Sequence, residues 1–426
     1  MNFSVLPNLI ALAILVAVFR AILRQGTTER LHLWLAGWIL VLVHFAAQFL
    51  DTGRGTWSQL ATSVNLDALL LAGVAFLISV STVVDSDSRR QALFASAIAL
   101  PALAYTNAVI WQVTAQSFYY CLIVLGLTAT TVLFCRYYGR FTLYAGGVLI
   151  SSWAIAGAVA WSVAHGTPVF GINFLLAGLN FVVAMLFWRR YRRTSAGVLT
   201  TVGGFVLWGA VFPTGMLLNS FAPSVKIDSE VWNIPKYLVA VGMILTLLED
   251  QIATSKYLAY HDALTGLPNR RLLEDRLEQA LAHADRTGNK VAVLLLDLDH
   301  FKEVNDTFGH HIGDLALQEI VRRLACRMRA ADTLARSGGD EFTVVSAVAD
   351  LDGAEVLVAD LESALSTPVS IEGSRFQTGL SIGVALYPDD GSNPDELHAA
   401  ADEAMYAAKR ATRDRALITR VPQTSV

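Results

Sequence analysis

The feature that most constrains this chain is a series of apolar segments that fills its first 250 residues. Each segment is close to the roughly 20 apolar residues that a membrane-spanning helix needs. We therefore expect a multi-span α-helical membrane bundle, whose first segment is too long for a removed signal peptide. The nine segments lie near residues 4–24, 32–50, 60–84, 91–111, 118–135, 141–164, 168–188, 197–219 and 231–249.

Charge divides the chain where these segments end. Residues 1–250 hold 14 Lys and Arg against 9 Asp and Glu, a formal balance of +5. Residues 251–426 hold 18 against 27, a balance of −9. This asymmetry excludes a single globular domain and a disordered chain. An acidic soluble part also argues against a partner that is a nucleic acid polymer.

Basic residues alternate between the loops, which orients the bundle because Lys and Arg are retained in the cytoplasm. The loops that are poor in basic residues carry only Arg54, Lys226 and Lys236. We expect nine spans, an N-terminus outside and the acidic part in the cytoplasm; if the Pro235-containing ninth segment were interfacial, only eight would remain. The rich loops carry Arg20, Arg24, Arg30, Arg89, Arg90, Arg136, Arg140, Arg189, Arg190, Arg192 and Arg193.

Among the polar residues inside the apolar segments, four stand out: His44, Asp67, Asn173 and Asn180. Ionisable groups at membrane depth are costly and often functional. Asp67 therefore indicates either a ligand pocket or ion path, or a residue that lies near the membrane surface or pairs within the bundle.

The cysteines offer neither a metal site nor a disulfide framework, because there are three of them and no two have metal-ligand spacing. Cys121 and Cys135 lie in an apolar segment and Cys326 in an amphipathic one. We therefore expect all three to be buried as small apolar side chains.

Residues 250–261 connect the membrane part, residues 1–249, to the soluble part, residues 262–426. The connector is polar, compatible with a helix and free of Pro and Gly. A stiff connector can pass a rotation or a shift from one part to the other, whereas a flexible one could not. We expect a helical signalling linker.

Helix-like and strand-like patterns alternate in the soluble part. The strand at 290–299 is a continuous apolar run, which suits a strand buried on both faces. The resulting order β-α-β-β-α-β is the ferredoxin-like arrangement of an α+β domain. Helices are expected at 269–286, 313–329, 354–366 and 395–410, a hairpin at 332–348 and a last strand within 375–388.

Two acidic clusters would meet at the end of this sheet. Asp297 and Asp299 end the first strand, and Asp340 and Glu341 lie in the hairpin turn. The first strand is expected beside the hairpin, so Asp297 and Asp340 would come together. Converging carboxylates need a cation, and hard oxygen ligands suit Mg²⁺ that serves a phosphate substrate.

Three further residues strengthen this interpretation over that of a simple acidic turn. Gly338 and Gly339 would let the backbone approach a ligand closely. Lys302 supplies positive charge for a triphosphate. Together with the acids they favour phosphoryl or nucleotidyl transfer, in which catalysis is positioning plus stabilisation of charge.

The sequence ARSGGDEF at 335–342 resembles the signature of the GGDEF family, the bacterial diguanylate cyclases. The resemblance covers the whole soluble part with several ordered motifs. These are DALTGLPNRR (262–271), LDLDHFKEVNDTFGHHIGD (296–314), LSIGVALYP (380–388) and ADEAMYAAKR (401–410).

This resemblance implies a cytoplasmic GGDEF catalytic domain with a nucleotidyl-cyclase-like fold, held at the bacterial inner membrane. The family condenses two GTP into cyclic di-GMP and two pyrophosphates, and each domain of a homodimer presents one GTP. The implied partners are GTP, cyclic di-GMP as product and inhibitor, membrane lipid and a second copy of the chain. The implied cofactor is Mg²⁺, with Mn²⁺ as the alternative.

Two other functions stay open from the sequence. The GGDEF domain could be a catalytically inactive receptor that binds GTP or cyclic di-GMP. The chain could also be a multi-span transporter with a regulatory nucleotide domain, although only Asp67 and His44 offer ionisable groups near the middle of the membrane.

The resemblance also implies roles for single residues. Asp340 resembles the base that deprotonates the 3′-hydroxyl group, and Lys302 the residue that stabilises the transition state. The implied metal ligands are Asp297, the carbonyl of Leu298, Asp340 and Glu341. The implied substrate-binding residues are Asn305, His310, Asp314, Gly338, Gly339, Lys409 and Arg413.

An Asn and Asp pair suits guanine, because Asp accepts from its N–H groups while Asn addresses O6 or N3. Arg329 and Asp332 resemble the inhibitory RxxD pair that binds product; the other interpretation of this pair is a surface salt bridge. In one departure from the family, Thr412 and Asp414 stand where Gly and Asn are usual.

Overall fold

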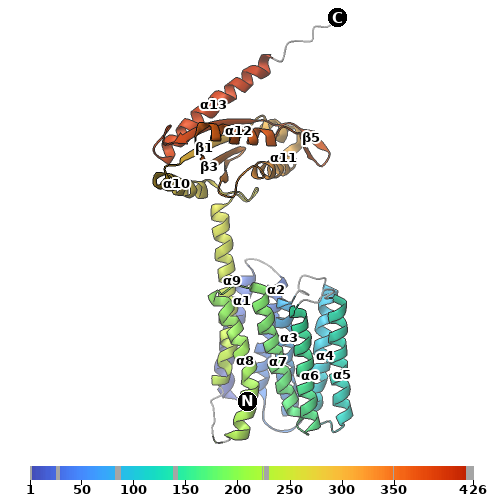
Figure 1. The fold of residues 1–426 in the computed structure, drawn as a ribbon. Helices are drawn as coiled ribbons and strands as arrows, with labels where there is room; N and C mark the ends of the chain where they lie inside the picture. Colours follow the sequence, from blue (N-terminus) through green and yellow to red (C-terminus); the bar gives the residue numbers. More distant parts are fainter. Residues whose placement is uncertain are drawn as a thin grey trace. The chain divides into compact units, whose positions relative to one another are not determined.

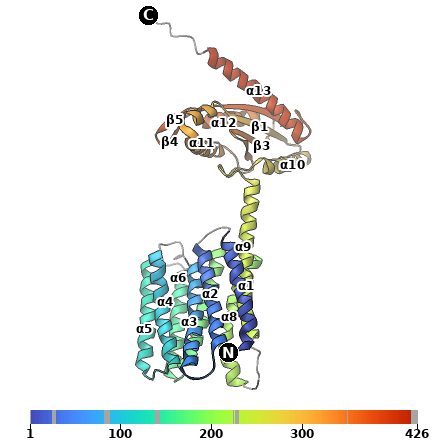
Figure 2. The same ribbon diagram turned by 180° about the vertical axis from the view of Figure 1, so that it is seen from behind.

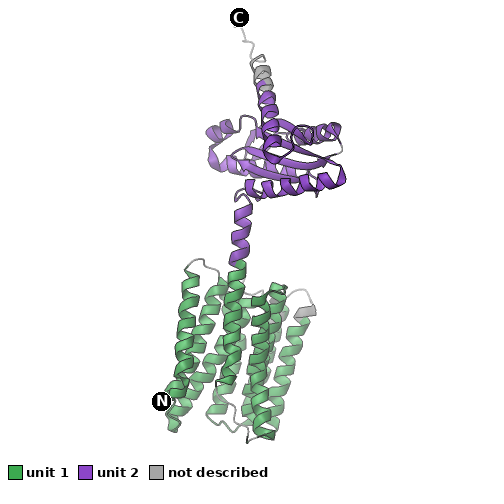
Figure 3. Ribbon diagram, turned by 90° about the vertical axis from the view of Figure 1, so that its left-hand side faces the viewer, with its two compact units in different colours: residues 1–250 green, residues 251–426 purple. Residues whose placement is uncertain are grey.

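The computed structural model describes residues 2–24, 29–81, 88–137, 143–222, 224, 230–348 and 350–418. It describes no side chains for residues 88, 134, 137, 143–145 and 411–418. The chain forms two compact units, Met1–Asp250 and Gln251–Val426 (Figure 3). Arg140 and Lys226, which contributed to the predicted orientation of the bundle, lie outside the described residues.

The first unit is a bundle of long helices that lie side by side (Figure 1). Within the described ranges, nine helices are long and apolar enough to cross a membrane. The predicted fold class of a multi-span helical bundle is therefore confirmed. The helices are α1 (Leu6–Leu23), α2 (Glu29–Leu50), α3 (Gly55–Val80), α4 (Ser88–Ile110), α5 (Gln116–Tyr137), α6 (Leu143–Ala164), α7 (Pro168–Tyr191), α8 (Ala196–Phe221) and α9 (Ile234–Tyr260).

Helix α9 is unbroken from Ile234 to Tyr260, so the connector that follows the last apolar segment is helical through Tyr260. Small residues bring α9 against α8. A Cβ atom added at Gly197 would clash with the backbone of Thr246, and one at Gly242 would clash with the backbone of Thr201. Small residues of this kind allow two membrane helices to approach closely.

Two of the ionisable side chains that stand out inside the apolar segments have hydrogen-bond partners within the bundle. The Asn107 amide donates to both carboxylate oxygens of the half-buried Asp67, at 3.0 and 2.9 Å. The buried His44 ring lies 3.2 Å from the Asn65 carbonyl oxygen. Asp67 thus pairs within the bundle, which was one of the two interpretations of this residue.

The prediction for the cysteines is wrong, because Cys121, Cys135 and Cys326 are all exposed free thiols. The first two lie on α5, whose outer face is turned away from the other helices, as the exposed side chains of Val124 and Leu125 show. An apolar segment identifies a membrane helix but does not say which of its faces is packed.

The second unit contains a four-stranded antiparallel sheet in the order β2-β3-β1-β6. Its elements follow each other as β1, α11, β2, β3, α12 and β6, so the predicted βαββαβ core is confirmed. Helix α10 precedes this core and α13 follows it. The strands are β1 (Lys290–Leu298), β2 (Thr333–Gly338), β3 (Glu341–Val348) and β6 (Leu380–Tyr387), and the helices are α10 (Arg270–Thr287), α11 (Phe301–Ala325), α12 (Leu351–Ala364) and α13 (Pro394–Ile418).

Strand β1 is buried from its second residue to its last, as expected for a strand covered on both faces. Its even-numbered side chains, such as Leu294 and Leu296, pack into a core with α11 and α12. Its odd-numbered ones, such as Val293 and Leu295, pack with α10 and α13. The residue at position 297 therefore points to the face that carries α13.

Two features of this unit differ from the predicted elements. A small hairpin of β4 (Val369–Ile371) and β5 (Ser374–Phe376) lies beside α11 (Figure 2). Glu372 and Gly373 form its turn with positive φ angles, which makes a two-residue hairpin possible. Helix α11 starts well before the predicted helix and is interrupted at Gly309, whose φ of 82° is not helical.

Candidate active site

The two acidic clusters meet where β1 ends and the β2–β3 turn begins. The Leu298 amide donates to the Asp340 carbonyl oxygen at 3.3 Å. Asp297 stands directly opposite Glu341 in the register of β1 and β3. The Asp297 residue is only 6% exposed, whereas Glu341 is exposed. The structure thus brings together Asp297, Leu298, Asp340 and Glu341, which the sequence placed at one site.

A lysine from α13 completes this acidic cluster. The Lys409 ammonium group lies 2.8 Å from the Oδ1 atom of Asp297. This hydrogen bond raises the pKa of Lys409; partial desolvation opposes the shift, and the charges of Asp297, Asp340 and Asp299 support it. Lys409 therefore contacts Asp297 and interacts electrostatically with Asp340 and Asp299, so the site carries charges of both signs.

Gly383 on β6 explains how α13 brings Lys409 to this place. A Cβ atom at Gly383 would clash with the Ala401 carbonyl oxygen and the Met405 amide nitrogen, so α13 can touch the sheet only because this residue is glycine. Ala401, Met405 and Lys409 recur every four residues and so lie along one face of the helix. The LSIGVALYP motif was recognised in the sequence, but the role of its glycine was missed, although a glycine inside a strand is a signal of close backbone approach.

Arg336 holds the turn that carries Asp340. Its Nε and Nη2 atoms donate to the Gly339 carbonyl oxygen at 2.9 and 2.7 Å, and its Nη1 atom lies 2.9 Å from the Oδ1 atom of Asp262. Partial burial opposes ionisation of Asp262, but hydrogen bonds from Thr265 and Arg336 outweigh it and lower the pKa of this carboxyl group. The sequence motifs contained both residues, yet their contact joins segments 74 positions apart and could not be inferred from them.

An open polar hollow lies beside this turn. Its lining includes Arg270, Arg271, Gly338 and Gly339. The two glycines present bare backbone there, and a Cβ atom at either position would meet no other atom within 4 Å. A basic hollow next to exposed backbone can accept an anionic ligand such as a phosphate.

The residues predicted to read the base, together with Lys302 and His310, lie on α11. Asn305 and Asp314 flank the interruption at Gly309. The Asn305 side chain lies against Gly313, where a Cβ atom would overlap its Oδ1 atom, so Asn305 reaches the segment that carries Asp314. Lys302, His310 and Asp314 are exposed, as groups that contact a ligand must be.

The remaining predicted site residues are Arg329 and Asp332, which form a turn, and Arg413 on α13. Asp332 accepts from the Arg329 amide at 2.8 Å and from the Ser346 hydroxyl at 2.6 Å, and the Arg329 side chain is exposed. The carboxylate of Asp332 thus stabilises a turn. Arg413 belongs to α13, but its side chain lies outside the described side chains.

The donor set of this site suits a hard divalent cation. Among the described residues, no group of three or more His, Cys, Asp or Glu side chains could hold a metal by itself. Mg²⁺ usually binds through one or two carboxylates together with substrate phosphates and water, so a complete protein cage is not needed. Asp297, the Leu298 carbonyl and Asp340 fit this requirement, and Mn²⁺ accepts the same ligand types.

Comparisons with known proteins show what the second unit is similar to. Residues 259–415 match the family described as "Diguanylate cyclase, GGDEF domain". The chain is 43% identical over 187 residues to the bifunctional diguanylate cyclase/cyclic di-GMP phosphodiesterase MucR of Pseudomonas aeruginosa, covering 40% of this chain and 27% of MucR. It is also 43% identical over 169 residues to the diguanylate cyclase TpbB of the same organism, covering 39% of each protein.

A solved structure with similar identity is that of a sensory box/GGDEF family protein from Caulobacter crescentus. It is 44% identical, and the match covers 36% of this chain and 99% of that chain with a TM-score of 0.35. The chain spans only about a quarter to two fifths of the length of the two curated relatives. The family match, at residues 259–415, lies in the second unit.

Proposed function

Because residues 259–415 match the GGDEF domain family, we propose that the chain is a membrane-anchored diguanylate cyclase. It condenses two GTP into cyclic di-GMP and two pyrophosphates. The observation that carries this proposal is the meeting of Asp297, Asp340 and Lys409 at the end of β1, where acidic and basic groups face one site. The cyclases among its relatives support the same activity.

The donor set supports a proposal for the metal and its ligands. Asp297, the Leu298 carbonyl and Asp340 would hold Mg²⁺ or Mn²⁺, with Glu341 at the rim of the site. Bound there, the cation would neutralise phosphate charge and polarise the α-phosphate group. The protein fixes these ligands through strand pairing, since Leu298 is tied to Asp340 by a backbone hydrogen bond.

The chain's own residues position the reacting groups. In each of two steps, a 3′-hydroxyl oxygen bonds to an α-phosphorus atom, the bond from that phosphorus to the pyrophosphate oxygen breaks, and the hydroxyl proton passes to a base. Asp340 is the candidate base. Lys302 and Lys409 stabilise the negative charge of the phosphates, and Arg413 is a further candidate for this role. The hydrogen bonds from Arg336 to the Gly339 carbonyl oxygen hold the turn that carries Asp340 in place.

Selection of guanine rests on α11. Asp314 would accept from the N1–H and N2–H groups of the base, and Asn305 would address O6 or N3. His310 would contact the nucleotide from the exposed side of the helix. The position of the Asn305 side chain against Gly313, next to Asp314 in the sequence, supports this assignment.

Regulation and assembly complete the proposal. A reaction that joins two GTP needs two such domains facing each other, so the active form is a homodimer. The exposed Arg329 side chain and Asp332 would bind cyclic di-GMP and restrain the enzyme. The helical bundle would anchor the chain in the bacterial inner membrane and pass a signal through α9, with the catalytic domain in the cytoplasm.

Product formation tests the activity directly. Purified full-length protein, incubated with GTP and Mg²⁺, should yield cyclic di-GMP, and Asp340→Ala should yield none while it keeps the fold and the dimer. Asp360→Ala, an exposed position on α12, serves as the matched control. Tight nucleotide binding without product by the parent protein, even when activated by enforced dimerisation, would favour a receptor instead of an enzyme.

A further inference from the structure

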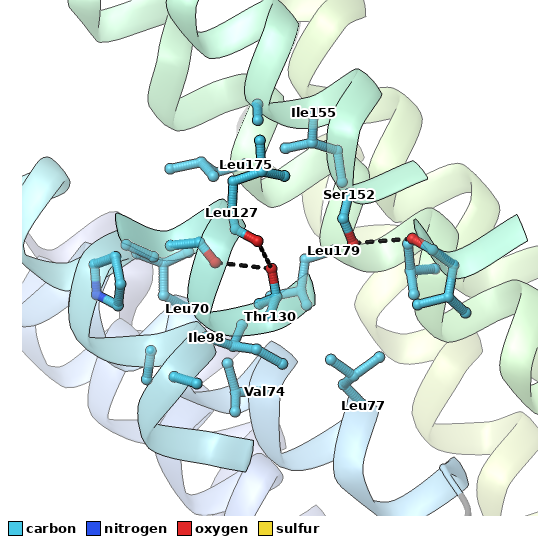
Figure 4. A pocket seen from close by; sticks show the side chains of 18 of the residues that line it. Leu70, Val74, Leu77, Ile98, Leu127, Thr130, Ser152, Ile155, Leu175 and Leu179 are labelled. Atoms are coloured by element: carbon cyan, nitrogen blue, oxygen red, sulfur yellow. Dashed lines mark hydrogen bonds between the residues drawn. The ribbon is translucent and has the colours of Figure 1, made fainter. Parts of the chain in front are cut away.

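The bundle contains an apolar cavity that no part of the proposed reaction uses. It has a volume of about 200 Å³ and is lined by residues of α3, α4, α5, α6 and α7 (Figure 4). Leucine, isoleucine, valine and alanine make up most of its wall. An apolar cavity of about 150 Å³ stays dry and takes up apolar ligands. This cavity is therefore large enough for a guest.

The cavity is elongated along the helices. Its lining runs from Tyr105 to Phe94 on α4 and from Leu175 to Leu186 on α7, and it covers comparably long stretches of α3 and α6. Eleven residues of helix correspond to about 16 Å at the rise of an α-helix. A space of this length and modest volume fits one extended chain better than a compact ring system.

The polar groups in the wall do not call for a polar guest. Thr130 donates to the Gly126 and Leu127 carbonyl oxygens at 2.7 and 3.1 Å, and Ser152 donates to the Val148 carbonyl oxygen at 2.9 Å (Figure 4). The Tyr105 hydroxyl donates to the Pro168 carbonyl oxygen at 2.9 Å. Because these hydroxyl protons are already used, the cavity offers a guest mainly dispersion contacts and exclusion from water.

One end of the cavity is flanked by basic residues. Arg90 lies one helical turn before the lining residue Phe94, and Arg190 lies one turn after the lining residue Leu186. Both residues belong to the same end of the bundle, where α4 begins and α7 ends. An anionic head group would be stabilised there, while its chain extends between the helices.

We propose that this cavity binds the single long alkyl chain of an anionic amphiphile, with its head group at the end marked by Arg90 and Arg190. Helix α5 closes the cavity toward the bilayer and exposes its other face, as the exposed Val124 and Leu125 show. The ligand of this cavity takes no part in the reaction proposed for the second unit.

Photolabelling of the full-length protein tests the proposal. The probe is a diazirine-bearing analogue of hexadecanoic acid, applied to protein in nanodiscs of phosphatidylcholine. Labels should map to cavity-lining segments of α4, α5 and α6 and should be displaced by hexadecanoic acid but not by octanoic acid. Labels spread over the outward faces of the helices, or not displaced by the long acid, would exclude the free acid as the guest, and the same result with the lipid probe described below would overturn the proposal.

Two substitutions on α6 provide a matched pair. Ala156 lines the cavity, whereas Ala154 on the same helix is exposed. Ala156→Phe should lower saturable labelling about tenfold, because its ring displaces two or three methylene groups of the guest. Ala154→Phe should label like the parent. Equal labelling of the two variants would contradict the assignment. If Ala156→Phe does not fold, the comparison of hexadecanoic with octanoic acid on the parent protein still tests the proposal.

The source of the chain is decided by a second probe, a phosphatidylglycerol with the same diazirine on one acyl chain. Labelling of the cavity by the free acid alone identifies a diffusible amphiphile, and labelling by the lipid alone identifies a bilayer phospholipid. Either result supports an alkyl-chain site, and failure of both probes refutes it. The readout does not depend on cyclase activity, so it is separable from the proposed function.

Discussion

Two acidic sites, one in each unit, have different partners, and this difference indicates where the chemistry lies. In the helical bundle, the half-buried Asp67 accepts hydrogen bonds from the neutral amide of Asn107. In the second unit, the charge of Lys409 interacts with those of Asp297, Asp340 and Asp299. Like charges held close together are costly unless a ligand or cation uses them.

The units also use glycine for different ends. Gly242 brings α9 against α8, so it stabilises a helix pair inside the bundle. Gly383 brings α13 against β6, and this contact places Lys409 at the acidic cluster. Close packing thus serves the fold alone in one unit and the active site in the other. Four variants can break or sharpen this contrast.

The largest effect is expected from Asp297→Asn. The amide keeps the size of the side chain but removes a metal ligand and the partner of Lys409, so kcat for cyclic di-GMP formation should fall by about 10²–10³. Product measured by chromatography gives the rate. Asp360→Asn should match the parent, and an Asp297→Asn variant with more than half the parent rate would show that the acidic cluster is not the catalytic centre.

A smaller loss is expected from Gly383→Val. The branched side chain would push α13 away from the sheet, lowering the free energy of unfolding of the second unit by about 1–3 kcal/mol. Displacement of Lys409 should also lower kcat, by about 10-fold to 100-fold. Thermal unfolding and initial rates measure the two effects. Gly157→Val in the bundle has open space around its Cβ position and should change neither.

A tenfold effect is expected from Arg336→Met. The substitution removes both hydrogen bonds to the Gly339 carbonyl oxygen and the ion pair with Asp262, which together hold the turn in place. The turn should become mobile and kcat should fall about tenfold, with little change in KM for GTP. Arg286→Met, an exposed arginine on α10, is the control. A pure rise in KM would instead assign Arg336 to substrate binding.

The smallest effect belongs to Arg329→Ala. This exposed side chain is assigned to the product site and not to the reaction, so the initial rate should stay within about twofold of the parent. Progress curves at high cyclic di-GMP should show several-fold weaker inhibition, because a charged contact to the phosphates is lost. If inhibition by product is unchanged, the Arg329 and Asp332 pair is only a structured turn.

Much of the fold follows from pattern. The long apolar segments predict the helices of the bundle, and the apolar run at 290–299 predicts a central strand with acids at its end. The β4–β5 hairpin was not predicted from the sequence, because its strands are only three residues long and lack a repeating pattern. The exposure of Cys121 and Cys135 was not predicted because the sequence of an apolar membrane helix does not reveal which face packs against other helices.

The parts of the candidate site that belong to a local sequence motif could be predicted. The parts that depend on a contact between distant segments could not. The meeting of Asp297 with Asp340 follows from the pairing of the first strand with the hairpin. The Asp262 to Arg336 contact and the approach of α13 at Gly383 depend on packing between distant segments. Motif resemblance identifies such residues but does not say what each one touches.

The central claim is that Asp297 and Asp340 form one metal and nucleotide site. Its most direct test is a Mn²⁺ titration of the full-length protein, followed by electron paramagnetic resonance, with a GTP analogue that cannot release pyrophosphate. We expect nucleotide-dependent Mn²⁺ binding by the parent and by Asp360→Asn, and at least about tenfold weaker binding by Asp297→Asn and by Asp340→Asn. Binding of equal strength in all four proteins would contradict the account.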